Sequence, residues 1–290
     1  MSRPLQQEEL RRLQAEVRAV AEHVRLALPQ PRGTAGEHLG RGVGASVEIH
    51  DHRPFVLGDD PRHLDWNAYA RTGQWIARTF RPEVMPRVDL AVDASASMWA
   101  YSAKQTRALQ LFYLLREGAR GAGASVRVHT VRADMVRCHE LEAVDHGSWW
   151  TPDEEPHDQA VPSLGRVPWR QGSLRIWLSD LLYPAEPRDS LAPLVRGAGR
   201  AIVLVPFAHQ EAAPQWQGNL TLVDPESQRR RVQYMEPDLL ARYAQAYARH
   251  FEAYARLGPS LGVSVARVSC EGELRPALNA EALRMGVFVA

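Results

Sequence analysis

Apolar and polar positions near the N-terminus alternate with a helical period. From Leu10 to Val24 the apolar residues recur at spacings of three and four, with Arg and Glu between them. This spacing predicts an amphipathic helix with an apolar stripe of coiled-coil type, ended by Pro29 and Pro31. We set residues 1–32 apart as an N-terminal amphipathic helix and expect its stripe to pack on the rest of the chain rather than on a partner.

The next segment, residues 33–86, has a weaker pattern. It opens with a glycine-rich stretch, 33–46, which favours a flexible connector over a phosphate-binding loop because no strand-to-helix junction surrounds it. Strand-like stretches follow at 47–50 and 75–80. We therefore expect a small β-rich segment here.

Acidic residues cluster between these two stretches. Asp59, Asp60 and Asp65 each lie close in sequence to an arginine. Asp60 precedes a proline, which is typical of a helix start, because the carboxylate caps free N–H groups and proline suits the first turn. The matching charges favour ion pairs and helix caps over a catalytic cluster.

From residue 88 onward, short apolar strands alternate with amphipathic helices. Strands are predicted at 88–92, 125–132, 136–141, 175–179, 201–206, 220–223, 231–235 and 263–268, and helices at 103–118, 190–196, 238–257 and 279–285. Residues 145–172 lack a periodic pattern and predict a long loop. The alternation indicates an α/β domain over residues 87–290, with a doubly wound, mostly parallel sheet.

Composition narrows the class of protein. The 290 residues carry 35 basic and 34 acidic side chains, a formal net charge of +1, and this balance argues against a general nucleic-acid binder. Two cysteines are too few for a disulfide framework or a four-cysteine metal site. No apolar run approaches the ~20 residues of a membrane span, and acidic residues near the N-terminus argue against a signal peptide. We expect a soluble, cytoplasmic protein without membrane insertion.

Lysine occurs once, at Lys104, and the other basic residues are all arginine. A glycine-rich loop ending in Lys and Ser or Thr is therefore absent, which excludes a P-loop ATPase. We attribute the skew toward arginine to genome composition.

Two predicted strands are followed by acidic residues, Asp93 and Asp180. The carboxyl ends of the strands form the ligand crevice of an open α/β sheet, so we expect these carboxylates to converge. Ser95 and Ser97 follow Asp93 at alternate positions, and a turn there can direct all three side chains to one point. Carboxylate and hydroxyl oxygens are preferred by Mg²⁺, Mn²⁺ or Ca²⁺. The four residues predict a divalent metal site that a partner's acid completes; alternatively, the serines only cap the following helix.

Two stretches of the chain resemble known family motifs. The run Asp93-Ala94-Ser95-Ala96-Ser97-Met98 is similar to the metal-ion-dependent adhesion site (MIDAS) motif of von Willebrand factor type A domains. The stretches 51–55, 58–62, 64–66 and 70–71 resemble the signature of the DUF58 family, which joins this signature to a von Willebrand A-like domain. The two patterns occur in that family's order and spacing, and the resemblance covers about residues 33–290.

The resemblance implies a Rossmann-like, von Willebrand A-like fold for the larger domain. It also implies an adaptor or co-chaperone that acts with a MoxR-type AAA+ ATPase on an unknown client protein. Ser95 and Ser97 would ligate the metal directly, and Asp93 and Asp180 mainly through water. A MIDAS motif also uses a threonine from a third loop, for which Thr151 is the nearest candidate, although the residues that flank it do not match.

Three functions remain in competition. We favour a non-enzymatic, metal-dependent protein-binding module. A metal-dependent hydrolase or phosphotransferase would use Asp93 with the acids at 59, 60 and 65. However, no Asp-x-Asp pair ends the first strand, and no Gly-x-Ser-x-Gly run follows a predicted strand as a nucleophile elbow does. A metal-free scaffold would bind its partner through the stripe from Leu10 to Val24.

Overall fold

The computed structural model describes residues 7–28, 49–56, 59–80, 85–149 and 161–289. The chain divides into two compact units: a larger one of Met1–Pro29 with Pro86–Ala290, and a smaller one of Gln30–Met85. The N-terminal helix, which the sequence analysis set apart, belongs to the larger unit. The glycine-rich stretch 33–46 lies outside the described residues.

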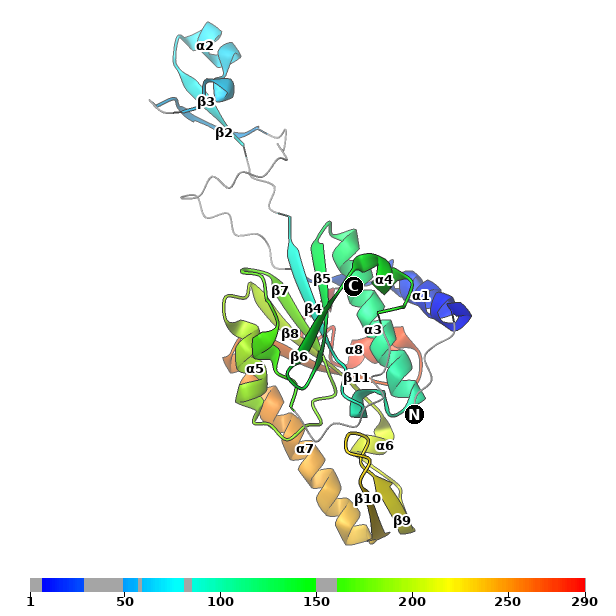
Figure 1. The fold of residues 1–290 in the computed structure, drawn as a ribbon. Coiled ribbons are helices and arrows are strands. Elements are labelled where there is room, and N and C mark those ends of the chain that lie inside the picture. Colours follow the sequence, from blue (N-terminus) through cyan, green and yellow to red (C-terminus); the bar gives the residue numbers. More distant parts are fainter. Residues whose placement is uncertain (1–6, 29–48, 57–58, 81–84, 150–160, 290) are drawn as a thin grey trace. The chain divides into compact units, whose positions relative to one another are not determined.

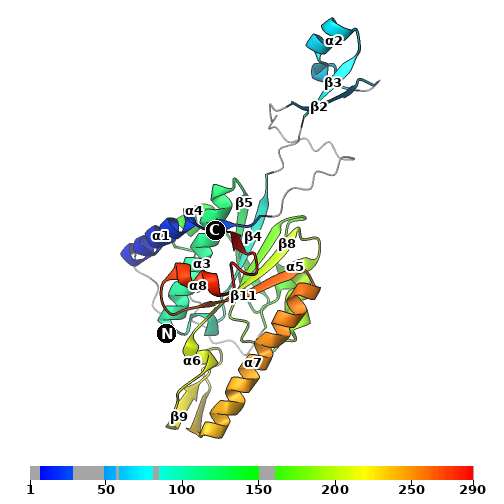
Figure 2. The same cartoon turned by 180° about the vertical axis from the view of Figure 1, so that it is seen from behind.

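A six-stranded sheet forms the centre of the larger unit (Figures 1 and 2). Across the sheet the strands follow the order β11 (Val263–Ser269), β8 (Arg200–Phe207), β7 (Leu174–Leu178), β4 (Arg87–Asp93), β5 (Ser125–Arg132) and β6 (Met135–His139). All neighbours pair in parallel except β5 and β6, which are antiparallel. Numbered along the chain, this is the order 3-2-1-4-5-6 that is common in doubly wound sheets. The predicted α/β class and the mostly parallel sheet are confirmed.

Helices cover both faces of this sheet. One face carries α3 (Ser102–Gly121), α1 (Gln7–Ala21) and α8 (Leu274–Ala280), and the other carries α5 (Pro187–Val195) and α7 (Pro237–Ser260). Side chains alternate between the faces of a strand, so Leu90 of β4 packs in the first layer and Ala91 in the second. Burial on both faces explains why the central strands are continuous apolar runs in the sequence.

The N-terminal stripe packs on the larger unit itself. The apolar residues from Leu10 to Val17 are buried in the core that includes α3. The helix ends at Ala21, and not at the prolines as the sequence predicted. Val24 is instead buried beside an extended stretch, where β1 (Arg25–Leu26) pairs with β12 (Phe288–Val289). Because residues 25–26 pair with β12, the chain leaves the helical conformation before them. No periodic spacing in the sequence predicts this pairing.

The remaining elements of the larger unit are short or peripheral. They are the 3₁₀ turns η2 (Ser97–Trp99) and η3 (Leu164–Arg166), the helices α4 (Leu141–Asp145) and α6 (His209–Ala212), and the antiparallel hairpin of β9 (Gly218–Val223) and β10 (Arg230–Met235). The last helix begins earlier than predicted, because Leu274 and Leu278 bury one face of α8 in the core. Across the described residues, no helix combines the length and apolarity needed to cross a membrane.

The smaller unit consists of a strand pair and two short helical elements. Strands β2 (Ile49–Pro54) and β3 (Ile76–Phe80) pair antiparallel, and η1 (Pro61–His63) and α2 (Trp66–Thr72) lie between them in sequence. Asp60 caps η1 and Asp65 caps α2 through their side chains. The cap at Asp60 and the second strand agree with the prediction, whereas the first strand extends to Pro54, four residues beyond its predicted end.

Candidate functional site

The sheet reverses its winding direction between β4 and β7. The chain leaves β4 through α3 on one face and leaves β7 through α5 on the opposite face. The carboxyl ends of two such strands border the crevice where open α/β sheets bind ligands. Asp93 is the last residue of β4, and Asp180 follows β7 after one intervening residue. The structure therefore brings the two predicted acids to one edge of the sheet.

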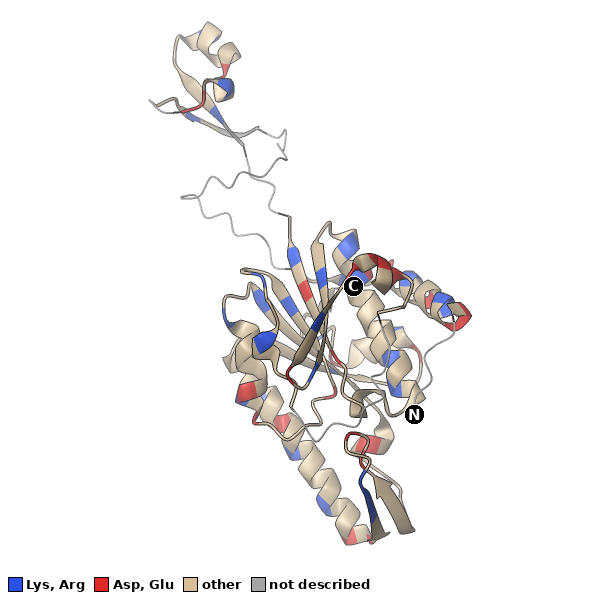
Figure 3. Cartoon of the chain, viewed as in Figure 1, with Lys and Arg blue, Asp and Glu red and all other residues tan. Residues whose placement is uncertain are grey.

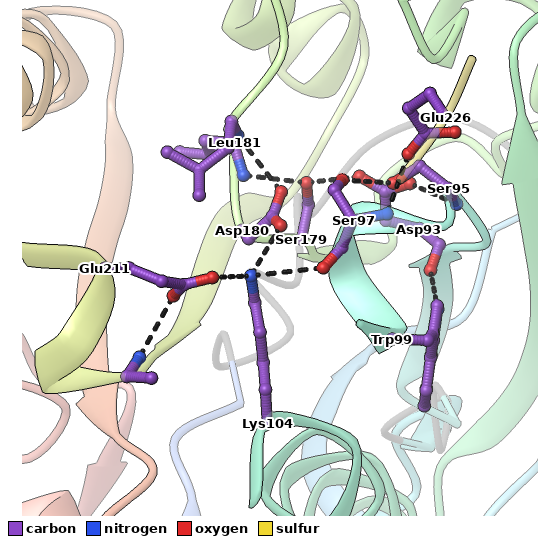
Figure 4. Close-up of polar contacts among 12 residues, drawn as sticks. Asp93, Ser95, Ser97, Trp99, Lys104, Ser179, Asp180, Leu181, Glu211 and Glu226 are labelled. Carbon is purple, nitrogen blue, oxygen red and sulfur yellow. Dashed lines mark hydrogen bonds and ion pairs between the residues drawn. The ribbon is translucent and has the colours of Figure 1, made fainter. Parts of the chain in front are cut away.

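Asp93 is fully buried at this edge (Figure 4). Its Oδ1 accepts a hydrogen bond of 2.9 Å from the Ser95 amide, and its Oδ2 accepts one of 2.5 Å from Ser179 Oγ. The Trp99 indole donates to the Asp93 carbonyl oxygen at 2.9 Å and fixes the turn. Burial and the nearby charge of Asp180 raise the pKa of Asp93 to about 7, against the hydrogen bonds that favour its ionised form. The favourable interactions of this carboxyl group are therefore too weak to offset its burial and the nearby charge of Asp180, which both favour the protonated form.

The two predicted serines lie together in the turn that follows β4. Ser95 Oγ and Ser97 Oγ are 3.4 Å apart. Neither serine caps a helix: the N-cap position of η2 is Ala96 and that of α3 is Tyr101, and neither makes a side-chain cap bond. The helix-capping alternative therefore does not explain these hydroxyl groups.

Lys104 of α3 lies beneath the turn, with no exposed surface. Its Nζ is 2.7 Å from Asp180 Oδ2 and 2.5 Å from Glu211 Oε1 of α6, and it also donates to the Ser97 carbonyl oxygen at 3.4 Å. Burial lowers the pKa of Lys104, but the charges of Asp180 and Glu211 outweigh burial, so the pKa is raised overall. The second oxygen of Asp180, Oδ1, accepts from the Leu182 amide at 3.0 Å.

The role of Lys104 was missed in the sequence, although a signal was present. Lys104 is the single lysine of the chain, and all remaining Lys/Arg positions are arginine. We attributed this skew to genome composition alone. A lysine carries a compact ammonium group, whereas arginine carries a broad planar fork. The enclosed position between two carboxylates gives a physical reason for the exception.

A second residue missed by the sequence analysis comes from the turn of the β9–β10 hairpin. Glu226 is half-buried, and its Oε1 accepts a hydrogen bond of 2.7 Å from the Ser97 amide. The two strands of the hairpin were predicted, at 220–223 and 231–235, but no role was assigned to the acidic residues between them. Because 129 positions separate Glu226 from Ser97, no local spacing could have joined them.

A small pocket lies at Ser95, Ser97 and Glu226, and neither Asp93 nor Asp180 is part of its lining. It has a volume of about 140 Å³, and its lining includes Ser95, Ser97, Tyr183, Asp224 and Glu226. We refer to Asp93, Ser95, Ser97, Asp180 and Glu226 together as the switch-point site. Figure 3 shows the acidic positions in the β9–β10 turn and in α6. Four carboxyl groups of residues 93, 180, 211 and 226 are grouped there with the single ammonium of residue 104.

The remaining candidate ligands fall elsewhere. Thr151, the candidate for the third-loop threonine, lies outside the described residues. In the part of the chain that the structure describes, no group of three or more His, Cys, Asp or Glu residues is arranged to hold a metal ion. A cation at the switch-point site would therefore have to use the serine hydroxyls as well as carboxylates.

The three acids singled out in the smaller unit, Asp59, Asp60 and Asp65, each pair with a basic group. The ion pairs are Asp59 with Arg53 at 2.6 Å, Asp60 with Arg62 at 2.8 Å, and Asp65 with Arg78 at 3.1 Å and His52 at 2.9 Å. Hydrogen bonds from these arginines lower the pKa of each carboxyl group, to about 2 for Asp60. Ion pairing and capping, the interpretation favoured from the sequence, describe this cluster.

Fold and site together define a mixed α/β protein with an acidic crevice at the switch point of its sheet. The family described as "Protein of unknown function DUF58" matches residues 51–253, and the chain belongs to this family. The resemblance seen in the signature from 51 to 71 is thereby confirmed.

Among solved structures, the chain is similar to the crystal structure of the conserved hypothetical protein BatB from Bacteroides thetaiotaomicron. The identity is 13%, the similarity covers 69% of this chain and 98% of that chain, and the TM-score is 0.35. No curated protein matches the chain.

Proposed function

We propose that the chain is a non-enzymatic protein-binding module in which a von Willebrand A-like domain binds a divalent cation at a MIDAS-type site. The observation that carries the proposal is the pair of hydroxyl groups of Ser95 and Ser97, 3.4 Å apart beside buried carboxylates. Hydroxyl and carboxylate oxygens are the ligands that Mg²⁺ and Mn²⁺ accept. The donor set present in the switch-point site therefore fits such an ion.

The charge distribution supports a cation at this position. Lys104 compensates Asp180 and Glu211, but no ion pair among the described residues involves Asp93 or Glu226. The raised pKa of Asp93 records that imbalance. A divalent cation would stabilise the ionised carboxylate, because an opposite charge nearby favours the charged form.

The residues would take the roles in metal binding that the MIDAS resemblance implies. Ser95 and Ser97 would ligate the ion directly, while Asp93 and Asp180 would act through water. Both oxygens of Asp180 already accept hydrogen bonds, from Lys104 and from the Leu182 amide, which suits an indirect role. When bound, the ion supplies a positive centre with a coordination position for a carboxylate of the protein partner.

Two competing functions receive less support. The acids at 59, 60 and 65 pair with arginines and cap helices, so they do not form an acid–base pair for hydrolysis. The stripe from Leu10 to Val17 is buried in the larger unit, which leaves little of it for a partner helix. We infer from family membership that the partner is a MoxR-type AAA+ ATPase that acts on a client protein in the cytoplasm.

Titration of the purified full chain with Mg²⁺ and Mn²⁺, followed by calorimetry, tests the cation. We expect one ion per chain, and an affinity about tenfold or more lower in Ser95→Ala and Ser97→Ala, since each loses a direct ligand. Ser260→Ala, an exposed change at the end of α7, should bind as the native chain does. Absence of binding to the native chain, or equal binding by all variants, would refute a metal site.

The partner is tested with a purified MoxR-type ATPase from the same organism in a surface binding assay. All samples contain Mg²⁺, because chelation would also disturb the nucleotide of the ATPase. The native chain and Ser260→Ala are expected to bind, and Ser95→Ala is expected to bind several-fold more weakly. Equal binding by the three proteins would show that the contact does not use the switch-point site.

A further inference from the structure

The β9–β10 hairpin brings a carboxylate from a distant part of the chain to the serine turn. Glu226 Oε1 accepts from the Ser97 amide at 2.7 Å, and Glu226 lines the same pocket as the two serine hydroxyls. Within the described residues, Glu226 Oε2 has no hydrogen-bond partner, and no ion pair involves this side chain. One oxygen is therefore anchored to the turn while the other remains available for a cation.

The hairpin turn is built to present this side chain. Asp224 Oδ1 accepts from the Glu226 amide at 3.0 Å, and Asp224 Oδ2 accepts from Ser227 Oγ at 2.6 Å. The Gln228 amide closes the turn on the Asp224 carbonyl at 2.9 Å, with Gln228 in the left-handed region at φ 57°. Asp224 thus fixes the turn, and Glu226 extends from it toward Ser97.

The rest of the hairpin is loosely held. Among the described strands, β9 and β10 pair only with each other, and a two-stranded hairpin alone is marginally stable. Val232 and Tyr234 of β10 are 72% and 56% exposed. The contact of Glu226 with Ser97 therefore connects this two-stranded hairpin to the switch-point site.

We infer that Glu226 is this chain's own acidic ligand of the switch-point site, held where the acidic side chain of a protein partner would bind. The inference rests on the proposed function, because it requires a cation between the serines and the carboxylate. An internal carboxylate acts at a high effective concentration, so it competes with any external one. A partner acid must displace the hairpin, and the site discriminates against weak acidic ligands.

The test uses Mn²⁺ as the probe with the purified full chain. The variants are Glu226→Gln, which keeps the shape but removes the charge, and Glu226→Ala, which removes the side chain. Glu252→Gln is the matched control, because it makes the same chemical change at an exposed position of α7. The measurements are Mn²⁺ affinity by calorimetry, the number of water molecules on bound Mn²⁺ by water-proton relaxation, and hydrogen exchange of residues 218–235 with and without Mg²⁺.

We expect Glu226→Gln and Glu226→Ala to bind Mn²⁺ about tenfold more weakly, with one more water on the ion. Mg²⁺ should slow hydrogen exchange of the hairpin in the native chain but not in these variants. Acetate at millimolar concentration should displace the additional water in Glu226→Ala and leave the native chain and Glu252→Gln unchanged.

The contrary results distinguish failure of the inference about Glu226 from failure of the proposed function. If the native chain binds Mn²⁺ but both Glu226 variants bind it equally well and with the same hydration, the inference is refuted and the proposed metal site stands. If the native chain binds no Mn²⁺, the proposed function fails first. Circular dichroism spectra like that of the native chain would show that the variants are folded, and Glu226→Gln, with the least steric change, decides the matter should Glu226→Ala unfold.

Discussion

Two aspartates on strand β4 differ sharply in their surroundings. Asp89 and Asp93 point to the same face of the sheet, and both are completely buried. Asp89 accepts a 2.6 Å hydrogen bond from Arg170 Nε, one of 2.8 Å from the Arg170 amide and one of 2.8 Å from Ser173 Oγ. Asp93 accepts hydrogen bonds from hydroxyl and amide groups, among them Ser179 Oγ and the Ser95 amide. Within the described residues, Asp89 has a cation in contact and Asp93 has none.

The difference separates a structural ion pair from a candidate site. Arg170 also donates to the Val88 and Ser125 carbonyl oxygens, so the Asp89 pair joins the first residues of β4 and β5 to the loop before β7. Among the described residues, Asp93 holds its own turn and Ser179. Burial alone would rank the two acids equally, whereas the absence of a cationic partner identifies the one at the crevice.

Removal of Lys104 should have the largest effect, because Lys104 is the counterpart of Arg170 at the site end of the sheet. Lys104→Met leaves the carboxylates of Asp180 and Glu211 buried without a cation. Loss of one partner of a buried pair costs about 3–5 kcal/mol, and here two acids lose theirs. Urea unfolding in EDTA should show a loss at the upper end of that range.

The control for this change is Arg188→Met, at an exposed position of α5. Surface changes of this kind alter stability by about 0.5 kcal/mol or less. Should Lys104→Met be as stable as the control, the ammonium would be dispensable, and the view of Lys104 as the compensating charge would be wrong.

Matched asparagine substitutions compare the two aspartates directly. Asp89→Asn leaves the Arg170 guanidinium, whose side chain is only 13% exposed, without its counter-ion, and we expect a loss of about 3 kcal/mol in the free energy of unfolding. Asp93→Asn removes a buried charge that has no cation, so in EDTA at pH 8 it should be neutral or stabilising. Equal losses from both changes in urea unfolding would show that the two sites do not differ.

The sequence predicted most of the fold because its strands are buried on both faces. Apolar runs such as 125–132 and 201–206 lie within one residue of β5 and β8. The errors arose where tertiary contacts override the local pattern. Val24 continued the helical spacing, yet the pairing of Arg25 with Val289 ended the helix before it.

The sequence predicted only those site residues that the parallel sheet itself brings together. Asp93 and Asp180 each follow a buried strand, and parallel strands bring such positions to one edge. The order of the strands does not place Lys104 or Glu226 at the site. Lys104 lies 76 positions from Asp180 in the sequence, and Glu226 lies 129 positions from Ser97. Their side chains reach the site through a helix and a hairpin whose docking no period or motif describes.

The smallest expected effect is a pH dependence that belongs to Asp93 alone. Its pKa in the folded chain is raised to about 7, above the ordinary value of about 3.9 in the unfolded chain. Between these values the folded state holds a proton that the unfolded state has lost, so stability falls as the pH rises and levels off above the folded pKa. For the native chain in EDTA, the free energy of unfolding should decrease by about 1 kcal/mol between pH 6 and pH 8 relative to Asp93→Asn. Urea unfolding across this range measures the difference, and parallel pH profiles for the two proteins would mean that Asp93 is already compensated, like Asp89.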